Sequence, residues 1–274
     1  IQARSNSSRL PGKIYSGIPD PAAPAQLEHI YWRLSSVGAD ELVVLIPEND
    51  FILRDWCRQH GMDVFTGSEL DVRDRYRAAA RHYGVDLIVR ATGDNPCVDP
   101  EVAADTILSL LKYDVDLFSY SNLPLGAAVE AFYAHALHSE IVAADAVQRE
   151  HVSLHIKHNP DVFRVRHDPH PLMEEFYGID VMPRLTVDTS ADLSVIRYVF
   201  SELGFEFSTA DVLRLFSRHP EPFRINQNIA QREFAISQPQ RITTTWAGDA
   251  VRTQGSYHQR RGGRTGQRPS GAYA

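Results

Sequence analysis

Cysteine is scarce in this sequence of 274 residues, which holds Cys57 and Cys97 and no others. Their positions fit neither a disulfide framework nor the ligand spacing of a zinc site. Free thiols are typical of proteins from reducing compartments. We therefore expect both cysteines to be buried and unpaired, and the protein to be cytoplasmic.

Long apolar runs are missing as well. No stretch approaches the roughly 18 apolar residues that indicate a transmembrane helix, so we expect no membrane segment. With 43% hydrophobic and 23% charged residues, the composition is typical of a globular protein. A chain of this length suffices for one large α/β domain or for two small ones.

Acidic residues are absent from the C-terminal end. None follows Asp249, whereas five arginines do, so the formal charge of −7 becomes about −12 for residues 1–251. A body this acidic is a poor binder of nucleic acid. Any nucleotide must then be held by a local basic pocket.

The apolar pattern fades from about Ser237 onward, and residues 255–274 are rich in Gly, Arg, Gln and Ser. Such a composition is typical of flexible segments. We therefore predict a folded domain over residues 1–235 and an irregular, flexible basic tail over residues 236–274.

Helical and strand patterns alternate through the first half of the chain. Apolar residues at three- and four-residue spacing predict helices at residues 25–37, 51–60, 71–83 and 100–112. Short apolar runs predict strands at residues 41–46, 63–65, 86–91 and 116–119. This rhythm predicts an α/β fold with a mostly parallel, doubly wound sheet, in which ligands bind outside the carboxyl ends of the strands.

The second half of the chain is less regular. Strands are expected at residues 129–133, 162–166 and 184–187. Helices are expected at residues 134–147, 149–158, 190–203 and 209–218, and Ser190 is the expected N-cap of the third.

A polar, cationic loop opens the chain. Residues 4–13 read Arg-Ser-Asn-Ser-Ser-Arg-Leu-Pro-Gly-Lys, which places Arg4, Arg9 and Lys13 around small polar residues. Backbone N–H groups of such residues form anion-binding nests, and cations add charge-assisted contacts to a polyphosphate. On these residues alone, an ordinary loop with solvated arginines explains the pattern equally well.

A second polar segment directly follows a predicted buried strand. Residues 92–96 read Thr-Gly-Asp-Asn-Pro, and Asp94 would lie at the carboxyl end of that strand, near the opening loop. A carboxylate in this place is suited to Mg²⁺. The same residues are strong turn formers, and the two interpretations are compatible.

A third polar segment, residues 185–193, reads Leu-Thr-Val-Asp-Thr-Ser-Ala-Asp-Leu. Asp188 is a second carboxylate at an expected strand end, before a predicted helix. Asp192 would lie in the first turn of that helix, where a negative charge interacts favourably with the helix dipole. We interpret Asp192 in this structural way.

These three segments, in this order and spacing, resemble the cytidylyltransferases that make CMP-activated sugars. The resemblance covers about residues 1–225 and is strongest to the SpsF-like branch of spore coat polysaccharide biosynthesis, which is related to acylneuraminate and CMP-Kdo synthetases. It implies a three-layer, Rossmann-like fold of the GT-A type. It also implies that the opening loop wraps the triphosphate of the incoming nucleotide.

The resemblance further implies roles for individual residues. Arg9 and Lys13 would bind the triphosphate and stabilise the leaving group, and Asp94 and Asp188 would hold Mg²⁺. The other nucleotide-binding candidates are Arg4, Ser7, Ser8, Ser68, Arg75, Thr92 and Asn95. Residues 67–76, which contain two of these, also read as a capped helix start with Ser68 or Asp71 as the cap.

One segment departs from the family pattern. Residues 123–130 match a sugar-side segment where the family typically has Arg-Gly-x-Asp/Glu-Val-Glu. Leu125 replaces the arginine and Ala128 replaces the first acid, so two polar sugar contacts would be missing. Glu130 remains as the candidate acceptor-binding residue. Residues 149–152 match a further family segment, in which we interpret His151 as structural.

We therefore predict a Mg²⁺-dependent nucleotidyltransferase that transfers CMP from CTP to a sugar or sugar-acid acceptor and releases pyrophosphate, for the synthesis of surface polysaccharide or glycoconjugate. The expected partners are a nucleoside triphosphate, with CTP favoured, and a sugar. No nucleic acid and no membrane are expected, and a homodimer through the second half is consistent with the resemblance.

Two alternatives remain. The first is a GT-A-type glycosyltransferase, which would normally carry an Asp-x-Asp motif after the central strand, and residues 94–97 lack it. The second is a non-catalytic nucleotide-binding protein with a degenerate sugar site. Leu125 and Ala128 favour this second alternative, whereas the intact cations and aspartates oppose it.

Overall fold

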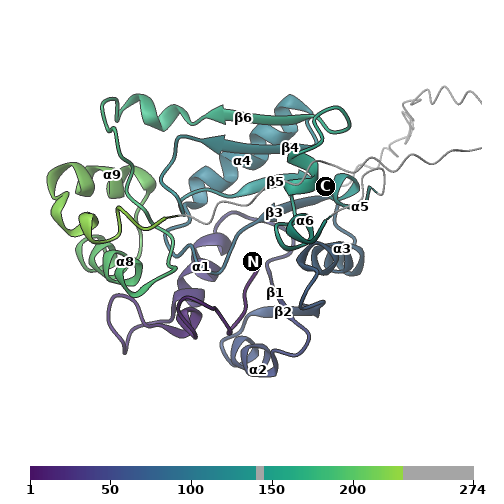
Figure 1. The fold of residues 1–274 in the computed structure, drawn as a ribbon, viewed down its shortest axis with the longest axis horizontal. Coiled ribbons are helices and arrows are strands. Elements are labelled where there is room, and N and C mark those ends of the chain that lie inside the picture. The colour runs from purple at the N-terminus through teal and green to yellow at the C-terminus, as the bar shows by residue number, and fades with distance from the viewer. Residues whose placement is uncertain (140–144, 231–274) are drawn as a thin grey trace, which may run out of the picture. The chain divides into compact units, whose positions relative to one another are not determined.

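Strands and helices alternate along the backbone of the computed structural model, which describes residues 1–139 and 145–230 (Figure 1). In chain order, the elements of the first half are η1 (Lys13–Tyr15), α1 (Gln26–Ser35), β1 (Val43–Pro47), α2 (Phe51–Gln59), β2 (Asp63–Gly67), α3 (Val72–Tyr83), β3 (Leu87–Arg90), α4 (Pro100–Tyr113) and β4 (Leu117–Ser121). Those of the second half are β5 (Glu130–Tyr133), α5 (Ala134–His138), α6 (Ala146–Glu150), α7 (Leu154–Lys157), β6 (Val165–Pro169), η2 (Pro171–Glu174), α8 (Ser190–Leu203), α9 (Thr209–Arg218) and η3 (Glu221–Ile225). The predicted α/β class is confirmed.

The central sheet is assembled around the N-terminal segment. Gln2 forms parallel bridges to Leu45 of β1 and to Thr92, just after β3. The strand order is therefore β2, β1, N-terminal segment, β3, β5, β4 and β6. Strand β5 runs antiparallel to β3 and β4, whereas the other described pairs are parallel. The prediction of a mostly parallel sheet is confirmed, with β5 reversed.

Helices cover both faces of this sheet. Val44 and Ile46 of β1 belong to a core that includes residues of α1, α2 and α4. Leu45, between them, belongs to a core with residues of α3, α5 and α7. Successive residues of a strand point to opposite faces. The three layers are therefore helix, sheet and helix, as the resemblance implies.

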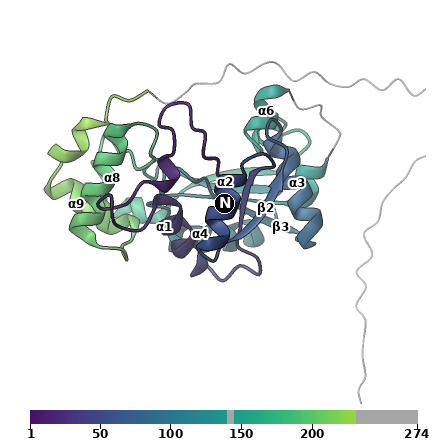
Figure 2. The same cartoon turned by 90° about the horizontal axis from the view of Figure 1, so that it is seen from below.

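A third core lies beside the sheet. It combines Val195 and Phe200 of α8 with Val212 of α9, and it includes Leu185 and Val187 from the preceding segment. Figures 1 and 2 both show α8 and α9 at one end of the sheet and α3 and α6 at the other. This packing brings the segment around Asp188 against the sheet.

The helices predicted at residues 134–147 and 149–158 are wrong in extent. The structure has the shorter α5, α6 and α7 instead, and residues 140–144 lie outside the described part. Val152, between α6 and α7, adopts a φ of 42°. A β-branched residue rarely takes this left-handed conformation, so apolar spacing gave no indication of the break.

The strand predicted at residues 184–187 is also wrong. The segment is extended, but it pairs with loops: Leu185 N donates to Leu125 O at 2.8 Å, and Val187 N donates to Asp94 O at 2.7 Å. Helix α8 begins at Ser190 as predicted, but its N-cap is Thr189, not Ser190. The Thr-x-x-Asp spacing explains this, because Asp192 completes a capping box with Thr189.

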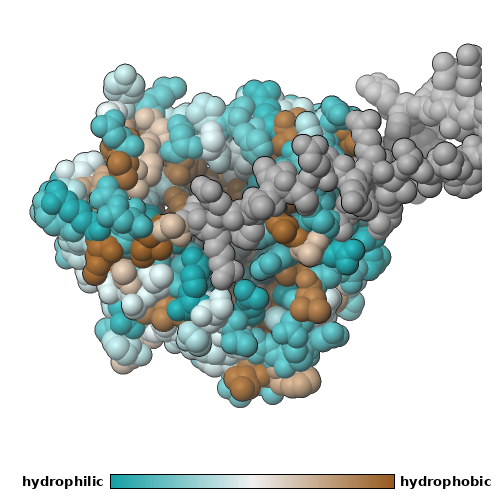
Figure 3. Space-filling model, viewed as in Figure 1, coloured by the Kyte–Doolittle hydropathy of each residue, from teal (hydrophilic) through white to brown (hydrophobic). Residues whose placement is uncertain are grey.

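Cys57 and Cys97 are buried and unpaired, as predicted. Burial raises the pKa of each thiol to about 12, so neither is poised to react. Within the described residues, no helix has the length and hydrophobicity needed to cross a bilayer. On the face shown in Figure 3, apolar residues form separate patches among hydrophilic ones. The predicted boundary at residue 235 and the tail lie outside the described residues.

Candidate active site

The opening loop is anchored by an acid that the sequence did not single out. Asp50, the N-cap of α2, accepts hydrogen bonds from Ser5 N at 2.8 Å and from the Ser5 hydroxyl at 2.8 and 2.9 Å. The carbonyl of Ser5 in turn accepts from Ser7 N at 3.1 Å and from Gly12 N at 3.0 Å. The loop is therefore closed on itself and fixed to the N-terminus of α2 before Lys13 begins η1.

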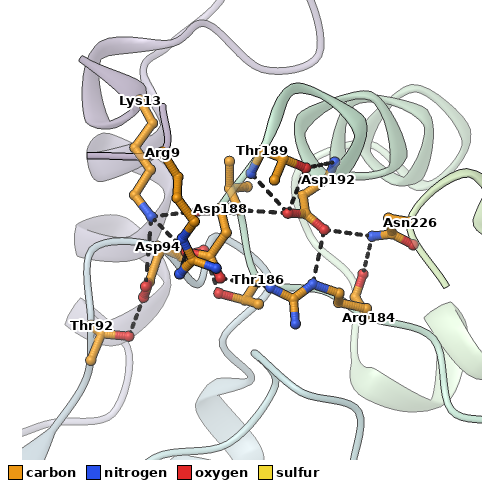
Figure 4. Close-up of polar contacts among 11 residues, drawn as sticks. Arg9, Lys13, Thr92, Asp94, Arg184, Thr186, Asp188, Thr189, Asp192 and Asn226 are labelled. Carbon is orange, nitrogen blue, oxygen red and sulfur yellow. Dashed lines mark hydrogen bonds and ion pairs between the residues drawn. The ribbon is translucent and has the colours of Figure 1, made fainter. Parts of the chain in front are cut away.

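Four residues predicted to share a site come together at the end of this loop: Arg9, Lys13, Asp94 and Asp188 (Figure 4). Lys13 is buried, and its ammonium nitrogen lies 3.2 Å from Asp188 Oδ1 and 3.7 Å from Asp94 Oδ2. Arg9 Nη2 lies 2.6 Å from the same Asp188 oxygen. Two aspartates that are far apart in the sequence thus face one ammonium group.

A buried network of ion pairs and hydrogen bonds holds Asp188 in place through Oδ2 and through the backbone next to it. Arg184 Nη2 lies 2.6 Å from Asp188 Oδ2, and Arg184 Nε lies 2.9 Å from Asp192 Oδ1. Asp192 is fully buried, and it accepts hydrogen bonds from the backbone N–H groups of Asp188 and Thr189 at 3.0 and 2.9 Å. Asn226 donates to Asp192 and to the carbonyl of Arg184, both at 3.0 Å. Asp192 therefore caps α8 and also fixes the backbone beside Asp188.

Residues 92–95 form a turn that presents the carboxylate of Asp94, so the turn interpretation is confirmed and the metal role of Asp94 stays a prediction. The Thr92 hydroxyl donates to Asp94 Oδ1. Gln26 of α1 donates to the carbonyl of Gly93 at 2.7 Å. A Cβ at Gly93 would lie 3.1 Å from that of Ala3, so the turn packs closely on the N-terminal segment.

Arg9, Lys13, Asp94 and Asp188 line one cavity of about 780 Å³. The candidates among its lining residues are Arg4, Ser7, Ser8, Arg9, Lys13, Arg75, Thr92, Asp94, Asn95, Glu130 and Asp188. Most of the site residues predicted from the sequence therefore line the same cavity. The ligand that each of them would contact stays a prediction.

Ser68 does not line this cavity within the described part of the chain. Its hydroxyl accepts from Asp71 N at 3.1 Å, and Asp71 is the N-cap of α3. Arg75 reaches the cavity, yet its guanidinium donates to the Ser68 carbonyl at 2.6 and 3.0 Å. The capped-helix interpretation of residues 67–76 thus describes their contacts, and Arg75 braces the loop before α3.

Glu130 also lines the cavity and lies among positive charges. It is ion-paired with Lys157 of α7 and with Arg90 of β3, whose Nη1 is 3.4 Å away. The Ser153 hydroxyl donates to it at 2.6 Å. Burial acts to raise the pKa of Glu130, but Lys157 and Arg90 outweigh burial and lower the pKa to about 2. Glu130 is therefore ionised at any ordinary pH.

Sequence reasoning missed Asp50, Arg184, Asn226 and Lys157. Asp50 carried a signal as an Asp directly before a predicted helix. Asn226 and Lys157 gave none, because their partners lie at least 27 residues away in the sequence, whereas Arg184 contacts Asp188 and Asp192, four and eight residues after it.

The donor set at Asp94 and Asp188 fits a magnesium ion. Both are hard oxygen ligands, and one oxygen of each lies within 3.7 Å of the same nitrogen. No group of three or more His, Cys, Asp or Glu suited to a metal occurs among the described residues. Mg²⁺ commonly takes one or two carboxylates and completes its shell with phosphate oxygens and water. The site therefore suits a metal that arrives with a nucleotide.

The fold is that of the nucleotidyltransferases. The structure of a cytidylyltransferase from Leptospira borgpetersenii matches with a TM-score of 0.73 and 27% identity, covering 85% of this chain and 97% of that chain.

More particularly, the chain belongs to the cytidylyltransferase family, whose model matches residues 1–245. The spore coat polysaccharide biosynthesis protein SpsF of Bacillus subtilis is 33% identical over 229 residues, which are 81% of this chain and 94% of that protein. An uncharacterized protein of Methanocaldococcus jannaschii is 34% identical over 241 residues, 85% of this chain and 96% of that protein.

Proposed function

We propose that this cytidylyltransferase transfers CMP from CTP to a sugar or sugar-acid acceptor in a Mg²⁺-dependent reaction. The observation that carries the proposal is the convergence of Arg9, Lys13, Asp94 and Asp188 on one cavity wall. The name of the Bacillus relative refers to polysaccharide biosynthesis, which supports a sugar as acceptor. The family assignment favours nucleotidyl transfer over the glycosyltransferase alternative.

In the proposed reaction, an oxygen of the acceptor forms a bond to the α-phosphorus of CTP and gives up its proton to water. The bond between that phosphorus and the bridging oxygen to the β-phosphate breaks, and pyrophosphate leaves with the electron pair. Lys13 and Arg9 would bind the β- and γ-phosphates, where negative charge develops. Asp94 and Asp188 would hold Mg²⁺, which supplies Lewis-acid stabilisation of the phosphate oxygens when it is bound.

The ion pairs within the site hold Lys13, Arg9 and Asp188 close to where the triphosphate and the metal would bind. Lys13 also lies 3.7 Å from Asp94 Oδ2, and both Lys13 and Arg9 contact Asp188 Oδ1. A triphosphate carries more negative charge than that oxygen, so both cations are expected to turn toward it. Arg184 would keep Asp188 in place through the opposite oxygen, Oδ2.

The proposal is tested by pyrophosphate release. The protein is incubated with Mg²⁺, each of the four nucleoside triphosphates in turn, and a panel of 3-deoxy-manno-octulosonate, N-acetylneuraminate and glucuronate. We expect release with CTP and at least one sugar, and a loss of at least about 100-fold in Asp94→Ala and Lys13→Ala, as for other groups that stabilise transition-state charge. Asp55→Ala and Lys112→Ala remove charges of the same kind from α2 and α4, outside the cavity, and serve as controls.

No release from the unmodified protein with any sugar would contradict the proposed activity. Calorimetry with CTP then distinguishes the alternative raised by Leu125 and Ala128, which both line the cavity. CTP binding without turnover would support a non-catalytic nucleotide-binding protein. Unchanged release from both site variants would instead contradict the assignment of the residues. The expected homodimer and cytoplasmic location stay predictions.

A further inference from the structure

Four polar residues form a row across the sheet on the floor of the cavity. Arg90 of β3 is paired with Glu130 of β5, Glu130 with Ser119 of β4, and Ser119 with His167 of β6. Residues directly opposite one another on neighbouring strands present their side chains on the same face. All four line the cavity. The strand register therefore builds a continuous polar surface from residues that are widely separated in the sequence.

The two ends of this row differ. At one end, Glu130 is occupied by Arg90, Lys157 and Ser153. At the other end, the hydroxyl of Ser119 and Nδ1 of His167 are hydrogen-bonded at 2.7 Å. That bond fixes the imidazole ring and uses Nδ1, which leaves Nε2 to interact with a ligand. Partial desolvation lowers the pKa of His167, so the ring is neutral at pH 8 and offers a single hydrogen bond rather than a charge.

The neighbours of His167 in β6 face the other way. Arg166 lies over the ring of Tyr113 in α4, 3.6 Å from its centroid, and its Nε lies 2.8 Å from Asp168. Of the five β6 residues, all of which the structure describes, only His167 lines the cavity. The alternation of the strand thus singles out one side chain for the cavity and offers Arg166 as a matched control.

The row contains Glu130, the residue that the resemblance predicts to bind the acceptor, so under the proposed function it lies on the sugar side of the cavity. The adjoining loop contributes Leu125 and Ala128, whose side chains offer no hydrogen bond to a ligand. A polyhydroxylated acceptor needs hydrogen-bonding partners, and a site that binds a hydroxyl through a fixed polar group discriminates strongly against analogues without it. The sheet floor supplies such partners where the loop does not.

We infer that His167 is a specificity-determining residue for the acceptor: its Nε2 binds a hydroxyl group of the sugar, and Ser119 orients the ring. This inference rests on the proposed function and deepens it. Recognition of the acceptor is carried by the floor of the cavity rather than by the loop at residues 123–128.

The test measures acceptor and CTP kinetics at pH 8 in three variants, with the panel sugar that gives the fastest pyrophosphate release. We expect His167→Leu to raise the acceptor KM about tenfold, which corresponds to one hydrogen bond, with the CTP KM unchanged. His167→Gln should recover most of the loss, because its side-chain amide can take the place of Nε2. Arg166→Leu, on the opposite face of β6, should leave both KM values unchanged.

Each outcome bears on the inference. Equal acceptor KM values for His167→Leu and the unmodified protein would overturn it while leaving the proposed function intact. A comparable rise in Arg166→Leu, or in the CTP KM of His167→Leu, would also overturn it, because the effect would then come from damage to β6 or to the whole site. If the unmodified protein releases no pyrophosphate with any panel sugar, the proposed function falls, and this inference falls with it.

Discussion

Individual charges in this protein are held by partners from distant parts of the chain. Glu130 illustrates this, because Arg90 of β3 lies 40 residues before it, whereas Ser153 and Lys157, at the two ends of α7, lie 23 and 27 residues after it. An ionised carboxylate in such surroundings is stabilised relative to the unfolded chain, where it is solvated. The charge state of Glu130 is therefore coupled to folding.

We predict a specific pH dependence of stability from Glu130. Its pKa is lowered from 4.5 to about 2, so its contribution to stability is complete above pH 4.5 and is lost as the pH falls toward 2. The full contribution is on the order of 3 kcal/mol. In urea unfolding, Glu130→Gln should be much less stable than the unmodified protein at pH 6, and the difference should shrink at pH 3.5.

The control is Glu202→Gln, which removes an exposed acid from α8. It should leave the free energy of unfolding nearly unchanged at both pH values. A difference between Glu130→Gln and the unmodified protein that is the same at pH 6 and at pH 3.5 would mean that the ion pairs of Glu130 do not stabilise the fold.

Among the helices, α8 and α9 offer a natural comparison. Both begin with a capping box: Thr189 with Asp192 in α8, and Ser208 with Asp211 in α9. The surroundings of the two acids differ, because Asp192 is fully buried and contacts Arg184, whereas the side chain of Asp211 is 42% exposed. The same Ser/Thr-x-x-Asp spacing therefore only caps the helix in α9, whereas in α8 its acid also makes tertiary contacts.

We predict that Asp192→Asn lowers the free energy of unfolding by about 3 kcal/mol, because it breaks a buried ion pair and a cap together. Asp211→Asn, at the same position of its helix, should cost about 1 kcal/mol or less. Urea unfolding of the two variants at pH 7 provides the measurement. Equal losses would show that the network around Asp192 contributes nothing beyond the cap.

The helices and strands of the first half were predictable because apolar spacing, Gly and Pro mark them locally. The predictions that were wrong failed because contacts between distant parts of the chain determine the structure there. Residues 184–187 are extended but bond to the carbonyls of Leu125 and Asp94, which no local pattern indicates. The break at Val152 depends on a left-handed backbone that the surrounding packing stabilises.

The site was predictable to the extent that it lies in short segments with a family resemblance. These segments gave Arg9, Lys13, Asp94 and Asp188. His167 could not be found in this way, because its place in the cavity depends on the register of β4 and β6. Ser68 was predicted to bind the nucleotide, and its hydroxyl accepts from the backbone of Asp71, the N-cap of α3. A polar residue in a loop looks the same in either role.

Across the whole described region, the site joins residues that are up to 175 positions apart in the sequence. Lys13 belongs to the first segment, whereas Asp188 precedes α8 in the third core. Arg33 of α1 links the two parts, because its guanidinium donates to Phe205 O at 3.1 Å and to Phe207 O at 2.6 Å, next to α9. The site therefore exists only when the α8–α9 layer is docked on the sheet.

The central claim is that Arg9, Lys13, Asp94 and Asp188 form one site for a metal–triphosphate complex. Its most direct test is a crystal structure with CTP and Mn²⁺, in which anomalous scattering locates the metal. We predict Mn²⁺ between Asp94 and Asp188, bound to triphosphate oxygens, with Lys13 and Arg9 turned from Asp188 onto the phosphates. Mn²⁺ that touches neither aspartate, or a triphosphate bound away from Lys13, would contradict the account.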